Sequence, residues 1–156
     1  MADRFAQAKT RNISLKELFF TGIGIYIGEG SKTGNFTRIV NSDPRIIAFM
    51  LWWLEKYFGI SESNIRIRLH IYPDNNEKKT INFWKKLLKL PDSCFHSCYI
   101  DRRTNKTKKK ANILPYGTAH MSVVNNGNKE FGGLLHRKIL ATIDHALKSG
   151  ISLVAE

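Results

Sequence analysis

Residues 15–29 constrain the fold more than any other segment, because they combine an almost unbroken apolar run with three glycines and a terminal acid. Ser14 and Glu17 have the spacing of a capping box, which predicts that a helix begins at Leu15. Apolar side chains occur on every side of this helix, so we expect it to be buried on every side. Each glycine costs a lone helix about 1 kcal/mol relative to alanine, so packing must offset that cost.

Two of the glycines, Gly24 and Gly28, are four residues apart, and Thr21 lies on a neighbouring part of the same helix face. Small residues at this spacing let two helices touch backbone to backbone, a geometry best known from membranes. We therefore expect Thr21, Gly24 and Gly28 to form the contact between two copies of the chain. If the two helices cross at a two-fold axis, both copies of Glu29 come close together.

Glu29 stands at the C-terminal end of this helix, where the partial negative charge of the helix disfavours an acid by roughly 0.3–1 kcal/mol. Gly28 and Gly30 flank it and let other backbone approach. A carboxylate beside free helix-end carbonyls is a set of hard oxygen ligands, which suits Mg²⁺ or a similar ion such as Mn²⁺. A bound cation would reverse the unfavourable charge. The alternative is a surface glutamate that happens to follow a helix.

The remaining pattern indicates a mixed α+β domain with one sheet. The expected order is α, β, α, β, α, β, β, α, without the regular βαβ signature of a nucleotide-binding fold. We expect one domain over residues 1–156, with residues 1–13 as an N-terminal extension. Helical patterns follow the first helix at residues 44–58, at 74–90 and from 129 to just before Gly150, and strand patterns occupy residues 33–41, 64–72, 95–101 and 116–124.

The net charge is large for the length, since 25 Lys and Arg against 13 Asp and Glu give +12 over 156 residues. A folded chain tolerates this self-repulsion more readily when an anionic partner screens it, and nucleic acid is the commonest such partner. A ribosomal or otherwise generic basic protein, or charge that serves only solubility, is the alternative. The charge therefore favours nucleic acid as the partner.

Cys94 and Cys98 are four residues apart without a matching Cys or His pair, so we expect reduced structural thiols and no zinc module. Charged residues between Asp3 and Arg11 interrupt the N-terminus, so we expect no signal peptide. The longest uncharged apolar stretches are too short to span a bilayer. These features predict a cytoplasmic, nucleoid-associated protein without a membrane partner.

The segment Gly24-Ile25-Tyr26-Ile27-Gly28-Glu29-Gly30 resembles the second part of the LAGLIDADG motif of homing endonucleases. In that family the motif helix forms the dimer interface and its terminal acid binds the catalytic divalent metal. Glu29 matches this acid. Gly28 matches the small residue whose carbonyl helps to bind the metal, and Gly24 matches the interface glycine. The resemblance extends loosely from Leu15 to about Lys148.

The chain departs from the family motif in three places. Gly22 and Ile23 replace the opening Leu-Ala, and Ile27 replaces the first Asp, which is not the usual metal ligand. Glu29 replaces the more frequent Asp, and its carboxylate remains a usable oxygen ligand with a longer reach. The departures therefore leave the features that the resemblance relies on in place.

The resemblance implies a LAGLIDADG-like fold in which a twisted antiparallel sheet, backed by helices, lies along the major groove. One motif per chain implies a homodimer that acts on roughly palindromic double-stranded DNA. The implied activity is Mg²⁺-dependent hydrolysis of phosphodiester bonds by a site-specific DNA endonuclease. The family also places a basic side chain near the cleaved phosphate, and Lys129 and Lys32 are the candidates in this chain.

Residues 64–72 alternate strictly, with four aliphatic side chains on one side and Arg66, Arg68, His70 and Tyr72 on the other. Two arginines and a histidine without an acid make an unusual solvent face. Arginine can bind guanine bidentately or contact phosphate, so we expect this side to bind DNA, with an ordinary solvated face as the alternative. Residues expected to extend the DNA-binding surface from the first strand, the late strand and a basic loop are Asn35, Thr37, Arg38, Thr118, His120, Ser122, Arg102, Arg103, Lys106, Lys108, Lys109 and Lys110.

Two other hypotheses stand beside the endonuclease. A relative on the same scaffold could bind without cutting, as a DNA-binding regulator or an intron-RNA splicing cofactor, because a fold does not fix a function. An acid at Glu29 between two glycines favours cutting. An unrelated basic RNA-binding protein is the third hypothesis, and the chain lacks the aromatic signature of such proteins.

We expect His136 and His145 to be structural or surface residues and Trp52, Trp53 and Trp84 to pack in the core.

Overall fold

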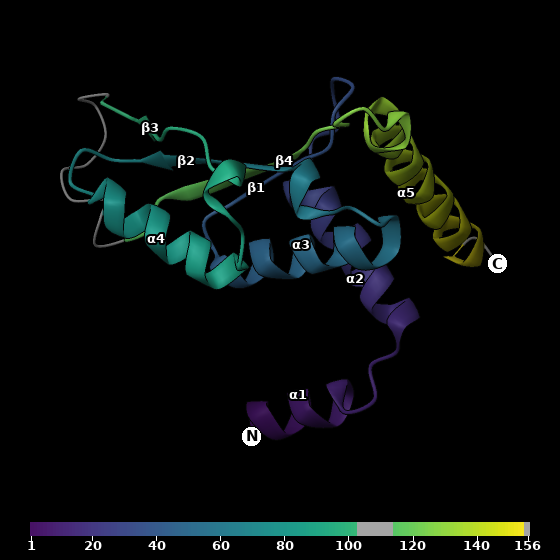
Figure 1. Cartoon of the computed structure of the whole chain (residues 1–156). Coiled ribbons are helices and arrows are strands. Elements are labelled where there is room, and N and C mark those ends of the chain that lie inside the picture. The colour runs from purple at the N-terminus through teal and green to yellow at the C-terminus, as the bar shows by residue number, and fades with distance from the viewer. Residues whose placement is uncertain (103–113, 155–156) are drawn as a thin grey trace.

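The structure is a computed structural model that describes residues 1–102 and 114–154. These residues form five α-helices and one sheet of four strands in the order β1-β4-β2-β3 (Figure 1). The α+β class with one sheet is therefore confirmed, and α1 precedes the elements that the sequence predicts. The elements are α1 Ala2–Thr10, α2 Leu15–Glu29, β1 Arg38–Asn41, α3 Pro44–Phe58, β2 Ile65–Ile71, α4 Glu77–Leu88, β3 Tyr99–Ile100, β4 Thr118–Val123 and α5 Gly133–Val154.

The sheet is mixed, which corrects the antiparallel sheet implied by the family resemblance. β4 pairs antiparallel with both β1 and β2, whereas β3 pairs parallel with β2. The chain passes from β2 to β3 through α4, and such a helical crossover returns the chain to run in its original direction. The connection through α4 therefore accounts for the parallel pair.

All four strands are shorter than the sequence predicts, β1 and β3 by the most, and the last helix extends further. β1 covers only Arg38–Asn41 and β3 only Tyr99–Ile100. α5 does not end before Gly150 but continues through it. One glycine costs a helix only about 1 kcal/mol, and the helical residues on both sides of Gly150 offset this. The prediction that the helix ends before Gly150 is therefore wrong.

The hydrophobic core lies between the sheet and the helices. Figure 1 shows α3 and α4 on one side of the sheet and no described helix on the opposite side. β2 turns Ile65, Ile67, Leu69 and Ile71 into the core, where each is at most 1% exposed. Trp53 and Trp84 are fully buried and Trp52 packs against the core, as expected.

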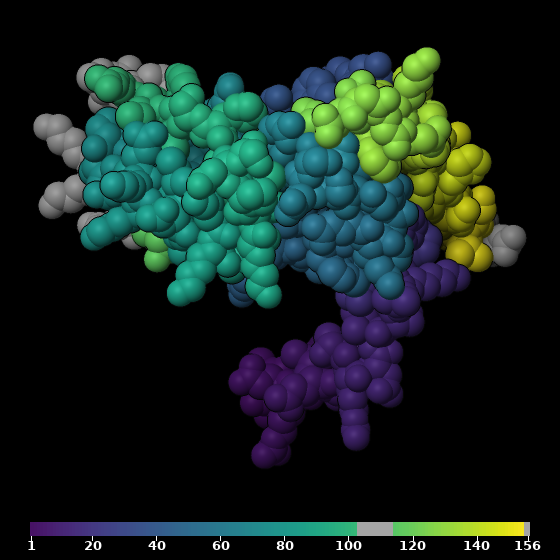
Figure 2. Space-filling model, in the orientation of Figure 1, coloured from purple at the N-terminus to yellow at the C-terminus, as the bar shows by residue number. Residues whose placement is uncertain are grey.

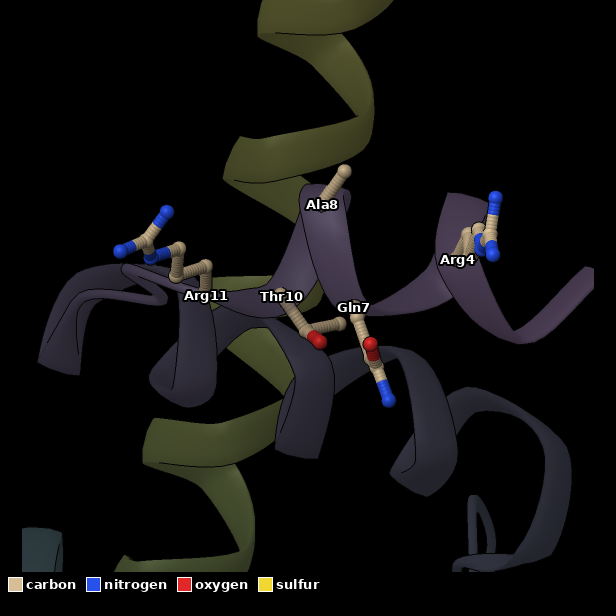
Figure 3. A pocket seen from close by; sticks show the side chains of 5 residues that line it. All are labelled: Arg4, Gln7, Ala8, Thr10 and Arg11. Atoms are coloured by element: carbon tan, nitrogen blue, oxygen red, sulfur yellow. The ribbon is translucent and has the colours of Figure 1, made fainter.

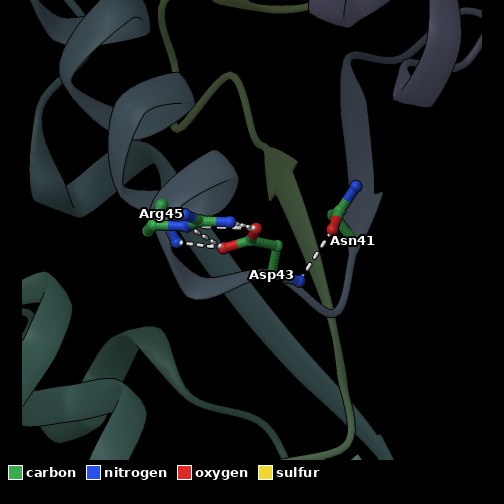
Figure 4. Close-up of polar contacts among 3 residues, drawn as sticks. All are labelled: Asn41, Asp43 and Arg45. Atoms are coloured by element: carbon green, nitrogen blue, oxygen red, sulfur yellow. Dashed lines mark hydrogen bonds and ion pairs between the residues drawn. The ribbon is translucent and has the colours of Figure 1, made fainter. Parts of the chain in front are cut away.

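Two helices begin with side-chain caps, and the first of these caps is the one that the sequence predicts. Ser14 and Glu17 form the capping box at the start of α2. At α3, the Asp43 carboxylate accepts the Arg45 N–H at 2.9 Å and pairs with the Arg45 guanidinium at 2.6 Å (Figure 4). Asn41 Oδ1 accepts the Asp43 N–H at 2.7 Å. Contact with Arg45 lowers the pKa of Asp43 to about 2, so this cap stays charged at neutral pH.

The N-terminal extension contains α1, which stands off from the body of the molecule. Figure 2 shows it as a separate lobe below the start of α2. No described residue of α1 is buried, and Phe5 is 68% exposed. The side chains that border an open hollow beside α1 point in different directions (Figure 3), and they belong to Arg4, Gln7, Ala8, Thr10 and Arg11.

Candidate metal centre and nucleic-acid interface

The C-terminal end of α2 is fixed against the outer strand of the sheet. The Gly30 N–H donates to the Tyr26 carbonyl at 2.9 Å, and Gly30 forms a β-bridge with Ile39 of β1. A Cβ at Gly30 would lie 2.5 Å from the Tyr26 ring, so the close approach requires glycine. Tyr26 is fully buried, and its hydroxyl lies 3.3 Å from Nδ1 of the buried His136 of α5. These contacts hold Glu29 at the sheet edge.

Carbonyls on either side of Glu29 already hold a cation. The Lys32 ammonium donates to the Gly30 carbonyl at 2.7 Å and, over a longer distance, to the Gly28 carbonyl at 3.4 Å. The Glu29 side chain is exposed. Positive charge is favoured at a helix C-terminus, where the last carbonyls lack helical partners. The Lys32 ammonium therefore occupies one of the two predicted metal ligands, the Gly28 carbonyl.

One chain supplies only part of a metal coordination sphere at this point. Glu29 offers a carboxylate and Gly28 a carbonyl, and both residues are exposed. Within residues 1–102 and 114–154, no group of three or more His, Cys, Asp or Glu side chains is placed to hold a metal ion. Mg²⁺ commonly uses one or two carboxylates and keeps several waters. Glu29 and Gly28 could therefore supply two oxygen ligands to a divalent ion, and the remaining ligands would have to come from outside the described residues.

α2 is buried on one side only, which corrects the expectation that the chain covers it on every side. Its buried residues are Gly22, Ile23 and Tyr26. A Cβ at Gly22 would overlap the indole of Trp53 from α3. The Trp53 indole N–H donates to the Phe19 carbonyl at 3.0 Å, which holds the ring in place. Packing between α2 and α3 therefore explains the first of the three glycines.

The other side of α2 is bare in the described structure. The three predicted interface residues Thr21, Gly24 and Gly28 are all exposed. A Cβ added at Gly24 or Gly28 would meet no described atom within 4 Å, apart from the helix's own backbone. Phe20 and Ile27 lie on the same stripe at 44% and 41% exposure. This stripe, called the bare face below, runs along α2 from Phe20 to Gly28, and Glu29 follows as the last residue of the helix.

The uncovered side of the sheet carries basic and polar side chains. Along β2 and β4 these alternate with buried apolar residues, as the sequence predicts. The strand register places Ser122 between Arg38 and Arg66, and it places His120 opposite Arg68. The residues of this polar face are Arg38, Arg66, Arg68, His70, Thr118, His120 and Ser122.

Two histidines of the polar face are stacked. The rings of His70 and His120 lie with their centroids 3.7 Å apart at an angle of 18°. Burial lowers the pKa of His120 to about 4, and the charges of His70, Arg38 and Arg68 add to this effect. Burial also lowers the pKa of His70, with Arg68 and Arg38 acting in the same direction and Asp101 opposing them. Both rings are therefore mainly neutral at neutral pH.

The sequence pattern did not single out two further residues beside the polar face. His96 lies together with the two stacked histidines around a hollow in the polar face. Tyr99 of β3 is paired with His70 in the strand register, and the two ring centroids are 4.8 Å apart. β3 has only two residues, so it shows no alternation from which the outward side of Tyr99 could be predicted.

Thr37 does not lie on the polar face, which corrects the prediction for it. Its side chain is 1% exposed, and its carbonyl accepts the Val123 N–H at 2.9 Å. Side chains alternate along extended chain, so an outward Arg38 requires an inward Thr37. Asn35 is exposed but lies against α5, where its Oδ1 accepts a hydrogen bond from Arg137 at 3.2 Å.

The other predicted residues lie at the margins of the sheet or beyond it. Tyr72 follows the end of β2 and is half-buried, whereas Arg102 follows β3 and is exposed. Lys129 is exposed in the short 3₁₀ helix that precedes α5. The remaining residues of the predicted basic loop lie outside the described residues, and they are Arg103, Lys106, Lys108, Lys109 and Lys110.

Comparisons with protein-family models, with curated proteins and with solved structures gave no match. The resemblance of Gly24–Gly30 to the LAGLIDADG motif therefore stays a prediction from the sequence. Across the two described ranges, no helix combines the length and the apolar character that crossing a membrane requires.

Proposed function

We propose that this protein is a homodimeric, metal-dependent endonuclease that cuts double-stranded DNA at specific sites. The observation that carries the proposal is the position of Glu29. This exposed acid is the last residue of α2, directly after Gly28 of the bare face, and the adjacent Gly30 is bridged to Ile39 at the edge of the sheet that carries the polar face. A carboxylate at this junction would lie where two copies of the chain and their DNA meet. The LAGLIDADG-like fold and motif are part of the proposal.

The dimer contact is assigned to the bare face of α2. Phe20 and Ile27 expose apolar surface there, and burying such surface is favourable by about 25 cal/mol per Å². Gly24 and Gly28 place no side chain between two crossing helices, so the backbones can approach closely. A two-fold crossing at these glycines would set the two copies of Glu29 side by side.

Duplex DNA is assigned to the polar face. The chain carries a net charge of +12, and no described helix covers this side of the sheet. Arg38, Arg66 and Arg68 are not among the ion pairs formed by described residues. Unpaired guanidinium groups can contact phosphates or read guanine. Two polar faces related by a two-fold axis would suit a roughly palindromic site.

The chemistry would take place at the end of α2. The Glu29 carboxylate and the Gly28 carbonyl would hold Mg²⁺ or Mn²⁺, which supplies water activation and stabilises the leaving oxygen in phosphodiester hydrolysis. The Lys32 ammonium, held at the Gly28 and Gly30 carbonyls, would place positive charge near the cleaved phosphate. Lys129 is the second candidate for this role. Such an enzyme would act in the cytoplasm, at the nucleoid.

One observation favours a second candidate function, a relative that binds nucleic acid without cutting it. The Lys32 ammonium shares the Gly28 carbonyl that a metal ion would use. If Lys32 keeps that place when DNA is bound, Glu29 forms no metal site. The protein would then act as a DNA-binding regulator or as an intron-RNA splicing cofactor.

The two functions are separated by incubating the purified protein with a library of randomised DNA duplexes, with Mg²⁺ or with EDTA, and sequencing the new ends. The endonuclease proposal expects ends that recur at one sequence in Mg²⁺ and are lost in EDTA. Tight duplex binding without new ends in Mg²⁺ or Mn²⁺ would reject the enzyme and support the regulator. Preferential binding of structured intron RNA would support the splicing cofactor.

A further inference from the structure

The polar face contains a hollow of about 360 Å³ at the centre of the sheet. Its walls come from β1, β4 and β2 and from the segment before β3, so four stretches distant in sequence build it. The lining residues include no acid in the described structure. They are Arg38, Arg66, Arg68, His70, His96, His120, Ser122 and Val124.

Contacts within the sheet hold two of the three arginines in place. Arg38 Nε donates to Ser122 Oγ at 3.1 Å, and its guanidinium lies 4.7 Å from the centroid of the Phe36 ring. Arg66 donates to the carbonyls of Ser63 and Ile65 at 2.9 and 2.7 Å. None of the arginines forms an ion pair with a described carboxylate. The hollow therefore holds three positive charges, of which those of Arg38 and Arg66 are held in place, and no described carboxylate pairs with any of them.

The stacked pair of His70 and His120 forms part of the hollow wall. With the ring centroids 3.7 Å apart, a proton on one imidazole strongly opposes a proton on the other. Positive charge from Arg38 on β1 and Arg68 on β2 disfavours protonation of either ring. Asp101, which follows β3, favours protonation of His70. The pair is therefore surrounded by more positive than negative charge.

None of the other described groups near the His70–His120 pair is a carboxylate. Tyr99 of β3 contacts the His70 ring with centroids 4.8 Å apart, and His96 lines the same hollow. Arg66 lies two residues along β2 from Arg68, opposite Ser122. A singly charged anion bound among these groups would offset positive charge of the arginines. It would also lower the free-energy cost of protonating one of the two histidines.

We propose that this hollow is a seat for one phosphate group and that the His70–His120 pair takes up a proton from solvent when the phosphate binds. A phosphodiester of the DNA backbone is the assigned source of that phosphate, and this assignment alone rests on the proposed function. The centre of the sheet then positions the duplex through its backbone, while residues around the hollow remain available to read bases. Binding of DNA would strengthen as the pH falls.

The first test uses inorganic phosphate as the probe and the full chain as the protein. The ring protons of His70 and His120 are followed by NMR as a function of pH, in phosphate and in chloride of equal ionic strength. The proposal expects the apparent titration of the pair to move to higher pH in phosphate. It also expects Arg68→Gln to reduce this movement, because that substitution removes one charge from an exposed side chain. Identical titrations in both salts would overturn the phosphate seat.

The second test measures the affinity for duplex DNA between about pH 7 and about pH 5. Each proton taken up on binding strengthens the affinity by up to about tenfold per pH unit. His120→Gln should reduce this dependence of the affinity on pH. If His120→Gln does not fold, Arg68→Gln is measured in its place and should also reduce the dependence. His145→Gln, on the exposed part of α5, is the matched control and should keep the wild-type dependence.

The two tests separate the phosphate seat from the proposed function. Duplex binding that is independent of pH, with no effect of phosphate on the histidines, overturns the seat and leaves the endonuclease proposal standing. Titrations that respond to phosphate in a protein that binds no duplex reject DNA as the source and assign the seat to free phosphate. A pH dependence that His120→Gln and His145→Gln leave equally intact places the proton outside the pair and overturns the inference.

Discussion

Gly22 lies so close to the indole of Trp53 that no side chain fits between them. Two residues further along the same helix, Gly24 faces a space in which no described atom outside the helix backbone lies within 4 Å. The glycines of α2 therefore differ in what they contact, although the sequence presents them as one set. Gly22 serves the fold of one chain, and we assign Gly24 and Gly28 to the contact between two chains.

Gly22→Ala should destabilise the fold. The added methyl group would overlap the Trp53 ring, and overpacking of this kind typically costs about 1–3 kcal/mol. Urea unfolding of the wild type and the variant measures the difference in the free energy of unfolding. An unchanged value would mean that α2 and α3 are packed less closely than the structure shows.

Gly24→Leu should weaken the dimer while leaving the fold of each chain intact. A leucine there would hold two crossing helices apart, but within one chain it points into open space. Helix propensity even favours the substitution by roughly 1 kcal/mol. Sedimentation equilibrium measures the dimer dissociation constant, and we expect it to rise at least about tenfold, equivalent to about 1.4 kcal/mol.

Gly150→Leu is the matched control, because Gly150 is also an exposed helical glycine with no described atom near its Cβ other than its own helix backbone. It should leave dimerisation unchanged. If Gly24→Leu and Gly150→Leu affect the dimer equally, or if the wild type is monomeric with and without DNA, the assignment of the bare face is wrong.

Arg68→Ala should weaken the binding of all duplex sequences and reduce its dependence on salt. Arg68 is exposed on the polar face and forms no ion pair with a described residue, so it is available to a phosphate. Loss of one phosphate contact lowers the slope of log K against log salt by about one unit. Lys56→Ala removes a positive charge from α3, on the opposite side of the sheet, and should leave the slope unchanged.

The stability of the fold should fall as the pH drops from about 6.5 towards about 4. Burial lowers the pKa of His120 to about 4 from an ordinary value of 6.5, so in this window the unfolded chain binds the proton first. The contribution of neutral His120 is fully present above pH 6.5 and is lost below it. Urea unfolding at several pH values should show a shallower fall for His120→Asn than for the wild type, and parallel curves would contradict the assignment.

The sequence predicts those features that repeat over several residues or follow from a local cap. The alternation of Arg66 and Arg68 with buried aliphatics fixed both the strand β2 and its outward side, because a period of two leaves one arrangement for a half-buried strand. Ser14 marked the start of α2, since its side chain satisfies a free backbone N–H group.

Features set by tertiary contacts could not be predicted in this way. Thr37 lies before a short strand, so its inward side depends on where pairing with β4 begins. The parallel pairing of β3 follows from the path of α4 and leaves no trace in the residues of β3 itself. The contact of Lys32 with the Gly28 carbonyl depends on the direction the chain takes after α2.

Cleavage by Glu29→Gln is the most direct test of whether the Glu29 carboxylate holds the catalytic metal. The duplex selected from the library is incubated with Mg²⁺ and the wild type, Glu29→Gln or Lys56→Gln, and both cutting and binding are measured. Removing even an outer-shell partner of a metal typically costs 10–100-fold, so losing the carboxylate should slow cutting by at least about a hundredfold. We predict this loss for Glu29→Gln with duplex binding retained, and none for Lys56→Gln. Cutting by Glu29→Gln at the wild-type rate would show that the Glu29 carboxylate does not hold the catalytic metal.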